Sequence, residues 1–419
     1  MQFASLPLGT ALRLMFAFGF GFFLSMFTRT QSNMVKQPIQ LELGLGEEAI
    51  SLALGASFFL TFALAQLPVG MLLDRYDPRK VNALLFLLAA AGAVVMGLSQ
   101  SVAMLSLGRV LMGIGFAAGL MGSLKIYALW FPQERLPTLN SLQFMIGVLG
   151  AWSATKPTEL LLRVLDWREL YFLFALITLL AAAIMVVVAP KHPATSAKES
   201  LAEQLRGLGR VYGDAYFWRI APWMCVSMGV AQGLNTLYVF SWLRDVSAYS
   251  VSAAATGVSL VTLVSAANFA LLGPLAERLG KRGYGPLLVP VIGQSLAMLL
   301  LAVLALQYDH AVIPQWLLWT MFAGTSTLAF SALSQAFPLH LIARVYTAFN
   351  LLGFLATALA QWTVGVVLDT FPVTATGAAP EGYQLAFGVL LAAQFLAAGW
   401  FFVAARLGIG RQTLLQKQA

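Results

Sequence analysis

The stretch Leu170–Pro190, LYFLFALITLLAAAIMVVVAP, carries no charged side chain along its whole length. A helix rises about 1.5 Å per residue, so a run of this length crosses the roughly 30 Å of hydrocarbon in a bilayer. Strands of membrane barrels alternate apolar and polar residues over about ten positions, and this stretch does not alternate. The stretch therefore predicts a membrane-spanning helix.

Apolar runs of similar length recur along the whole chain. Of its 419 residues, 59% are hydrophobic and 10% are charged, and the mean hydropathy is +0.81. A soluble fold of this size could not bury so much apolar surface, so we expect lipid to cover it. We predict an all-α membrane protein with twelve transmembrane helices, at residues 9–31, 50–72, 81–99, 104–130, 138–161, 170–190, 218–243, 253–275, 285–307, 314–337, 345–368 and 384–405.

The longest polar interruption falls near the middle of the chain. It runs from Lys191 to about Phe217 and contains charged residues of both signs. Such a composition is typical of a linker between two domains. We predict a six-helix bundle at 1–190, a cytoplasmic linker at 191–217 and a second six-helix bundle at 218–419.

The formal net charge of +8 would suggest a nucleic-acid partner in a soluble protein. Here the cations gather in every second loop, and the opposite set of loops holds only Lys36, Arg163, Arg168 and Arg244. Loops rich in Lys and Arg stay in the cytoplasm, so we expect both termini there, in a bacterial inner membrane. The excess charge is therefore topological, and no nucleic-acid partner is expected.

A pattern of a glycine, an acid four residues later and then several cations occurs twice, in the loop after the second helix of each half. The copies are Gly70, Asp74, Arg75, Arg79 and Lys80, and Gly273, Glu277 and Arg278. A second repeat relates Asn140, Phe144 and Trp152 to Asn350, Phe354 and Trp362 at one constant offset. Two six-helix halves in parallel orientation are implied.

These patterns resemble those of the major facilitator superfamily over essentially the whole chain. The resemblance implies a secondary transporter in which two bundles rock about a central site, and in which the loops at Gly70–Lys80 and Gly273–Arg282 latch one end state. Gly70 would let two helices approach closely, and Asp74 could accept hydrogen bonds from a helix N-terminus. The alternative is that these are plain cytoplasmic loops rich in positive charge.

Helix 4 contains Arg109-Val-Leu-Met-Gly113-Ile-Gly115, which resembles the second motif of the family. An arginine inside hydrocarbon needs a partner or a wet cavity, although it could also snorkel to the interface. Helix 5 reads Gly147-Val-Leu-Gly150-Ala-Trp152, without the central proline that drug exporters of the family carry. This difference weakens a drug–proton antiport interpretation.

Ionisable residues in or at the edges of the predicted helices are mostly cations. Arg29, Arg109, Lys125 and Lys156 stand against one acid, Glu159. Buried ionisable residues mark function by default, and an anionic solute would supply the missing counter-charge. Lys156 and Glu159 can form an intrahelical pair instead, Lys125 can snorkel, and Arg29 can be an interfacial anchor.

The predicted substrate site lies between the two halves. In the first half, Phe22, Ser25 and Arg29 fall on one face of helix 1, and Arg29 and Arg109 could clamp a carboxylate, with Lys125 facing the opening. The second half would add the neutral side chains Gln232, Asn235 and Tyr238. Polar side chains in spans also bind helices to one another, and this alternative stays open.

We expect uptake of a small organic anion, coupled to H⁺ or Na⁺ or to neither, by a monomer that needs no cofactor. Efflux of a drug or metabolite is the alternative within transport, and a non-transporting receptor is the alternative outside it. An enzyme is not expected, because no nucleophile, base and orienting group stand out together. No metal site is expected at His192, His310 and His340, whose spacing is not that of metal ligands.

Overall fold

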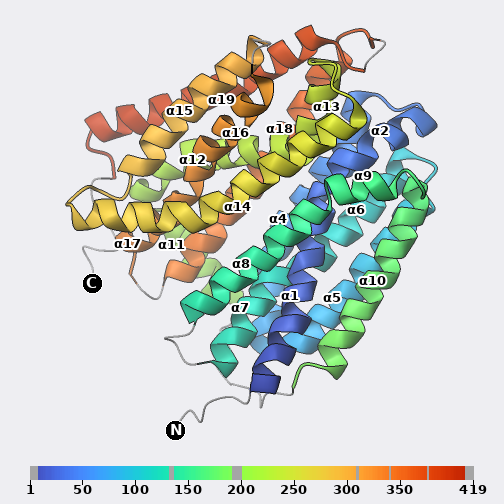
Figure 1. Cartoon of the computed structure of the whole chain (residues 1–419). Helices are drawn as coiled ribbons and strands as arrows, with labels where there is room; N and C mark the ends of the chain where they lie inside the picture. The colour runs from blue at the N-terminus through green and yellow to red at the C-terminus, as the bar shows by residue number, and fades with distance from the viewer. Residues whose placement is uncertain are drawn as a thin grey trace. The chain divides into compact units, whose positions relative to one another are not determined.

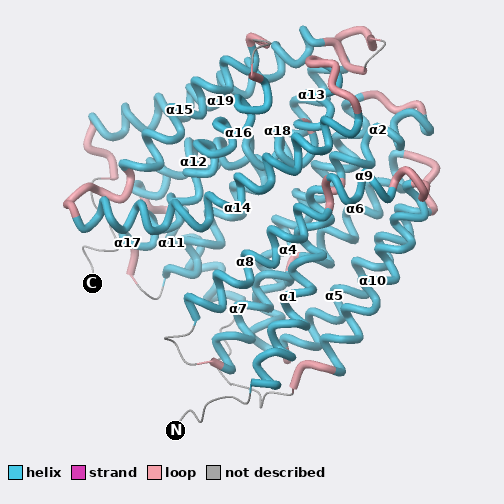
Figure 2. The backbone as a smooth tube through the Cα atoms, viewed as in Figure 1, coloured by secondary structure: helices cyan, strands magenta, loops and turns pink. Residues whose placement is uncertain are grey.

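The computed structural model describes residues 8–131, 136–190, 201–307, 311–338, 341–374 and 377–410. Throughout these ranges the ordered elements are helices, and none is a strand (Figures 1 and 2). The predicted all-α membrane fold is confirmed. His192, His310 and His340 lie outside the described residues.

The chain forms two compact units. The first unit comprises Met1–Leu45 and Leu52–Glu199, and the second comprises Gly46–Ser51 and Ser200–Ala419. The helices of the first unit are α1 Leu8–Thr30, α2 Ser32–Leu43, the π-helical turn η1 Leu52–Ala56, α4 Ser57–Arg75, α5 Pro78–Gly97, α6 Val102–Phe116, α7 Ala118–Trp130, α8 Leu136–Ser153, α9 Lys156–Leu161 and α10 Trp167–Val187. The helices of the second unit are α3 Glu47–Ser51, α11 Leu201–Tyr212, α12 Ala215–Leu237, α13 Val239–Asp245, α14 Val251–Lys281, α15 Leu288–Ala305, α16 Val312–Ala323, the 3₁₀ turn η3 Gly324–Leu328, α17 Ala329–Ala336, α18 Ile342–Asp369 and α19 Pro380–Arg406.

Within the described residues, ten helical stretches are long and apolar enough to cross a membrane. The other two predicted spans, 138–161 and 218–243, fall on the interrupted pairs α8 with α9 and α12 with α13. Each unit therefore holds six of the twelve predicted spans.

Polar side chains begin several of these helices. Asp77 accepts a hydrogen bond from the backbone N–H of Arg79 and precedes Pro78, the first residue of α5. Asp166 and Glu169 form a reciprocal capping box at the start of α10. Such caps satisfy the N–H groups that the first turn of a helix leaves unpaired, which fixes where the apolar run becomes helical.

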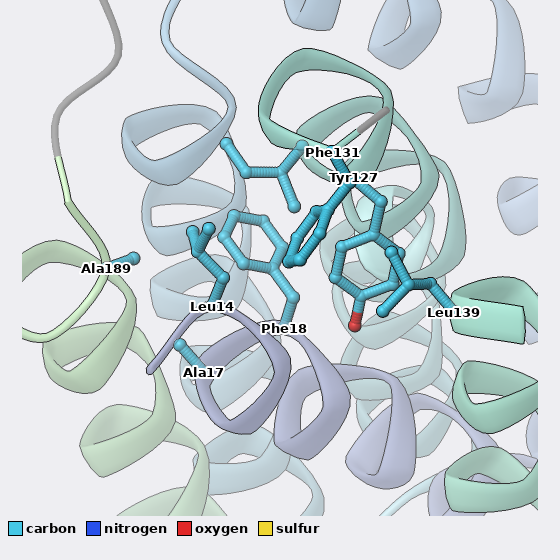
Figure 3. Close-up of a cluster of buried hydrophobic side chains, with 8 residues drawn as sticks. Leu14, Ala17, Phe18, Tyr127, Phe131, Leu139 and Ala189 are labelled. Carbon is cyan, nitrogen blue, oxygen red and sulfur yellow. The ribbon is translucent and has the colours of Figure 1, made fainter. Parts of the chain in front are cut away.

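The core of the first unit packs around one face of α1. Leu14, Ala17 and Phe18 meet Tyr127 and Leu139 in a buried cluster, which Figure 3 shows as a group of interlocked side chains. Farther along the same face, Phe22 lies against Gly147, where any Cβ would approach its ring within 2.2 Å. The absence of a side chain at Gly147 therefore allows α8 to pack closely against α1.

Several spans are interrupted within their length. In the first unit, α1 and α2 are separated at Gln31, and α6 and α7 at Ala117. In the second unit, Tyr238 separates α12 from α13, and η3 separates α16 from α17. An interruption leaves backbone carbonyls without their usual helical donor, and inside a membrane another group must supply one.

The first span is longer than the sequence predicted. Beyond Thr30 the chain continues as α2 to Leu43, whereas the prediction ended the helix at residue 31 and placed Lys36 in a loop. The side chains of Asn33 and Lys36 are buried, with 0% and 1% exposed. The polar residues that suggested a loop are thus interior residues of a helix.

Candidate functional site

Ser25 lies about halfway along the membrane-spanning helices of the first unit. Its hydroxyl donates to the backbone carbonyl of Phe116 over 3.5 Å. Phe116 is the middle residue of the span Val102–Trp130, so Ser25 lies near the centre of the membrane. Arg29 follows one helical turn later, about 6 Å farther along α1.

Arg29 is buried close to this level. Its guanidinium carbon lies 4.3 Å from the centre of the Phe62 ring, and its Nη2 donates to Ser25 Oγ over 3.5 Å. Phe62 stands near the middle of the span Glu47–Leu73. A cation over an aromatic face is attracted by the negative charge of the ring. Ser25, Arg29 and Phe62 thus form a buried cluster that contains a cation and an aromatic ring near mid-membrane, and Phe22 lies one turn before Ser25 on α1.

Arg109 is completely buried, and short hydrogen bonds hold its guanidinium. Nε donates to Leu54 O over 2.7 Å and Nη1 to Thr28 O over 3.1 Å. Nη2 donates to Ser32 Oγ over 2.6 Å. Leu54 lies in the π-helical turn, and Thr28 and Ser32 flank the interruption between α1 and α2. Arg109 therefore supplies donors where two helices depart from regular hydrogen bonding.

The two arginines share one aromatic surface on α4. The Arg109 guanidinium carbon lies 4.9 Å from the centre of the Phe58 ring, and the Phe58 and Phe62 rings stack with their centres 5.9 Å apart. Each arginine thus lies over one of two stacked rings. The structure brings Arg29 and Arg109 to neighbouring levels of one unit, and only Arg109 is shown tied to interrupted backbone.

Lys125 lies elsewhere. It is half-buried on α7 and follows the middle of its span by nine residues, about 13 Å along the helix. Arg29 is displaced from the middle in the opposite direction, because Ser25 meets Phe116 and α1 runs antiparallel to α6 and α7. The two cations therefore occupy different levels of the membrane.

Lys36 is a buried cation that sequence reasoning missed. It follows Arg29 by seven residues and Asn33 by three, so it continues the helical face formed by Phe22, Ser25 and Arg29. That spacing was visible in the sequence and could have identified it. The buried acid found among the described side chains of this unit is Glu159, which pairs with Lys156 over 2.6 Å and with Arg163 over 2.8 Å.

The predicted residues of the second unit bond within that unit. The Tyr238 hydroxyl donates to Gln361 O over 2.8 Å and lies 2.5 Å from Ser51 Oγ. Asn235 Oδ1 accepts from the Thr320 hydroxyl over 3.4 Å. Gln232 is half-buried one turn before Thr236, whose hydroxyl donates to its carbonyl.

A neutral polar cluster surrounds the interruption between α16 and α17, and the sequence had not indicated its centre. Gln294 Nε2 donates to Phe322 O over 3.2 Å, to Ala323 O over 2.9 Å and to Thr325 Oγ1 over 2.9 Å. Asn268 Nδ2 donates to Thr320 O over 3.1 Å. Among the described side chains of the second unit, the buried charged one is Asp214, at the start of α12. The side chains described around this interruption are thus polar but uncharged.

The predicted latch residues are found at helix ends of both units. Arg79 is buried, donates to both carboxylate oxygens of Asp77 and also donates to Ala189 O over 2.8 Å. Burial alone would raise the pKa of Asp77, but the hydrogen bonds from Arg79 outweigh it and lower that pKa. Arg75 and Lys80 are exposed, and the side chain of Asp74 lies outside the described residues.

In the second copy of the pattern, Glu277 pairs with Lys281 over 2.6 Å on the surface, and Arg278 is exposed. A Cβ placed on Gly273 would meet no atom within 4 Å, and one on Gly70 would meet only Met121 Cε, at 3.9 Å. The latching role of both loops stays a prediction.

Comparison with known proteins gives a family match. The family model described as "Major Facilitator Superfamily" matches residues 18–361. Over 280 residues, the chain is 23% identical to the probable sulfoacetate transporter SauU of Cupriavidus necator, an alignment that covers 62% of this chain and 64% of the relative. It is also 23% identical over 396 residues to the probable L-galactonate transporter of Escherichia coli, covering 86% and 83%. Sugar and multidrug transporters also match over shorter segments.

The chain thus spans just under two thirds of the length of the sulfoacetate relative. Among solved structures, an inward-facing bacterial homologue of the human lysosomal transporter Spinster superposes with a TM-score of 0.79 at 18% identity, over 96% of this chain and 98% of that chain. At that identity the likeness shows the fold alone.

Proposed function

The chain belongs to the Major Facilitator Superfamily and is a secondary transporter of that type; from this premise we propose that it takes up a small organic anion, with Arg29 as the cation that binds it. The observation that carries the proposal is the burial of Arg29 near mid-membrane, over Phe62 and beside Ser25. A cation inside a membrane is costly, and an anionic substrate lowers that cost whenever it binds.

The charge balance of the first unit supports an anion. Four cationic side chains are buried in it. Arg79 pairs with Asp77 at a helix end, which leaves Arg29, Lys36 and Arg109 deeper in the unit. The buried carboxylate described there, Glu159, is already paired with two cations. A guanidinium presents paired N–H donors that match the two oxygens of a carboxylate or sulfonate. The names of the two relatives point the same way, since sulfoacetate and L-galactonate are organic anions.

The contacts of the two arginines support different roles for them. Arg109 donates to Thr28 O, Leu54 O and Ser32 Oγ at 2.6–3.1 Å, and moving it toward a substrate would break three short hydrogen bonds inside the membrane. Arg29 donates to the Ser25 hydroxyl over the longer distance of 3.5 Å and lies over the Phe62 ring. We therefore assign substrate binding to Arg29, and to Arg109 the fixing of α1 directly beside it.

Transport would then follow alternating access. In this mechanism the two units move as bodies about the bound anion, and the loops at Gly70–Lys80 and Gly273–Arg282 hold one of the two end states. The neutral side chains of the second unit, Asn235 and Gln232 among them, would complete the site without adding charge.

The test is a thermal-shift screen of the purified full-length protein against acetate, sulfoacetate, galactonate and nitrate, with glucose and choline as uncharged and cationic comparisons. A ligand that binds only the folded protein raises its melting temperature. We expect shifts with organic anions, loss of these shifts in Arg29→Gln and partial retention in Arg29→Lys. The matched control is Arg13→Gln, which removes an exposed arginine of the same helix. Shifts with glucose or choline alone would contradict the proposal.

A further inference from the structure

Lys36 is a buried cation that the binding of an anion at Arg29 does not account for. It lies on α2, about 16 Å beyond Ser25 along the helices, where a lysine can ordinarily extend its ammonium group to water. Its side chain is instead 1% exposed. An interfacial anchor would keep its charge in water, so Lys36 does not have that role. A charge buried in a membrane protein is costly and marks a functional position.

Lys36 and Arg29 lie on the same side of the helix. They are seven residues apart, which is close to two helical turns, so their side chains leave the helix within about 20° of each other. Gln31, which separates α1 from α2, keeps right-handed helical dihedral angles, and its backbone N–H donates to Phe27 O over 3.0 Å. The shared face therefore continues across the separation. Asn33 lies on this face between the two cations and is completely buried.

The two cations offer different chemistry to a ligand. The guanidinium of Arg29 presents a planar fork that matches both oxygens of a carboxylate, whereas the ammonium of Lys36 is a point charge that accepts an anionic group in many orientations. Both side chains are buried, and opposite charges attract each other more strongly there than in water. The stripe of Arg29, Asn33 and Lys36 therefore suits a ligand with an anionic group at each end and a polar middle.

The spacing of the two cations limits the length of such a ligand. Seven residues of helix place the Cα atoms of Arg29 and Lys36 about 10 Å apart along the axis. A charge-assisted hydrogen bond at each end takes up about 2.8 Å, which leaves about 5 Å between the two anionic groups when the side chains extend in parallel. The distance is shorter when the side chains bend toward each other. A short dianion, such as a four-carbon dicarboxylate, fits this spacing.

We propose that the substrate is a short dianion, with one anionic group bound by Arg29 and the second by Lys36. This inference rests on the proposed function and adds two things to it. It states the number of charged groups on the substrate, and it identifies Lys36 as the residue that selects for the second one. An anion with a single charged group would bind at Arg29 alone, and more weakly.

The test is titration calorimetry of the purified full-length protein with two matched pairs of ligands, succinate with succinamate and sulfoacetate with sulfoacetamide. In each pair the second ligand has the same length but carries an uncharged amide in place of one carboxylate. We expect the wild type to bind the dianion at least about tenfold more tightly. Lys36→Met should weaken dianion binding roughly tenfold and change binding of the amide less than about twofold. Lys36→Arg keeps the charge and should retain most of the preference.

The matched control is Arg13→Met, which removes an exposed cation from the same span and should bind all four ligands like the wild type. Equal affinity of the wild type for both members of each pair would overturn the inference, and this comparison needs no variant to fold. Equal losses for both members in a folded Lys36→Met protein would also overturn it. Failure of the proposed function looks different, because then no anion binds the wild type, or Arg29→Gln binds both members of a pair unchanged.

Discussion

The two units solve the same physical problem with different side chains. Each has an interrupted helix inside the membrane, and each must supply donors to carbonyls that the interruption exposes. In the first unit, Arg109 donates to Thr28 O and Leu54 O with a charged guanidinium. In the second unit, Gln294 donates to Phe322 O and Ala323 O with a neutral amide.

Under the proposed function, this difference favours the first unit as the place where an anion binds. The neutral amide of Gln294 donates to the carbonyls of the second unit, as do the Thr325 and Ser326 hydroxyls, and none of these donors adds a net charge. The guanidinium of Arg109 satisfies those of the first unit and also leaves a positive charge beside Arg29. The donor that serves the interruption thus adds a positive charge near the proposed anion site in the first unit, and the corresponding donor in the second unit adds none.

The largest effect on stability is expected at Arg109. Arg109→Leu leaves three buried acceptors without their described donor, and we expect a loss of about 3 kcal/mol or more in the free energy of unfolding. Denaturant unfolding of the purified protein measures the loss, with Arg13→Leu as the control. An unfolding free energy equal to that of the wild type would show that Arg109 does not stabilise the interruptions.

A smaller loss is expected at Gln294. Gln294→Leu removes one neutral amide from the carbonyls of Phe322 and Ala323, at a cost of roughly 1–3 kcal/mol. Anion affinity should be unchanged, because no charge is lost. Titration calorimetry with the best anion from the screen tests this, and a tenfold weaker affinity in a folded Gln294→Leu protein would break the contrast between the units.

Substitution of two phenylalanines of α4 can distinguish anion binding by Arg29 from the hydrogen bonding of Arg109 to the interrupted helices. Phe62 lies under Arg29 and Phe58 under Arg109, and both rings are buried. Phe62→Leu should weaken anion affinity roughly fivefold, because the ring no longer holds the guanidinium. Phe58→Leu makes the same change in volume and should alter affinity less than about twofold. Equal effects on the dissociation constant would argue against separate roles for the two arginines.

The smallest predicted effect is on the pH dependence of stability, through the hydrogen bonds that join Glu42 of α2 to α10. Glu42 accepts hydrogen bonds from Trp167 Nε1, at 2.6 Å, and from Arg168, and these bonds lower its pKa. The folded protein thus binds fewer protons at Glu42 than the unfolded chain, so its stabilising contribution is present above the ordinary carboxylate pKa of about 4.3 and is lost as pH falls through the lowered pKa.

Acidification should therefore lower the melting temperature slightly more in the wild type than in Glu42→Gln, while Glu381→Gln should follow the wild type. In the second unit the corresponding acid, Asp245, accepts from the uncharged Tyr383 hydroxyl over 2.8 Å. Identical melting profiles of wild type and Glu42→Gln between about pH 3 and pH 6 would show that the pair contributes nothing.

The sequence predicted the fold class and the number of spans because each helix that crosses the hydrocarbon core needs a long run of apolar residues, and such runs can be read directly. It did not predict the interruptions. Gln31 and Ala117 keep right-handed helical dihedral angles and are neither glycine nor proline, so nothing in their residue type marks them. Without the interruptions, Arg109 could be predicted only as a candidate ligand for substrate.

The sequence identified candidate site residues where a charged side chain falls inside a predicted span. It missed them where the helix continues past the end of its apolar residues. Arg29 was identified in this way, whereas Lys36 was assigned to a loop because polar residues surround it. The contact of Asp369 with Glu47 and Glu48 joins residues more than three hundred positions apart, and no local pattern announces such a contact.

The most direct test of the central claim is counterflow in proteoliposomes loaded with the organic anion that most stabilises the purified protein. Uptake of the labelled anion from outside reports binding and passage without any assumption about coupling. We expect uptake by the wild type and by Arg13→Gln, and none by Arg29→Gln. Full uptake by Arg29→Gln, with every tested anion, would contradict it.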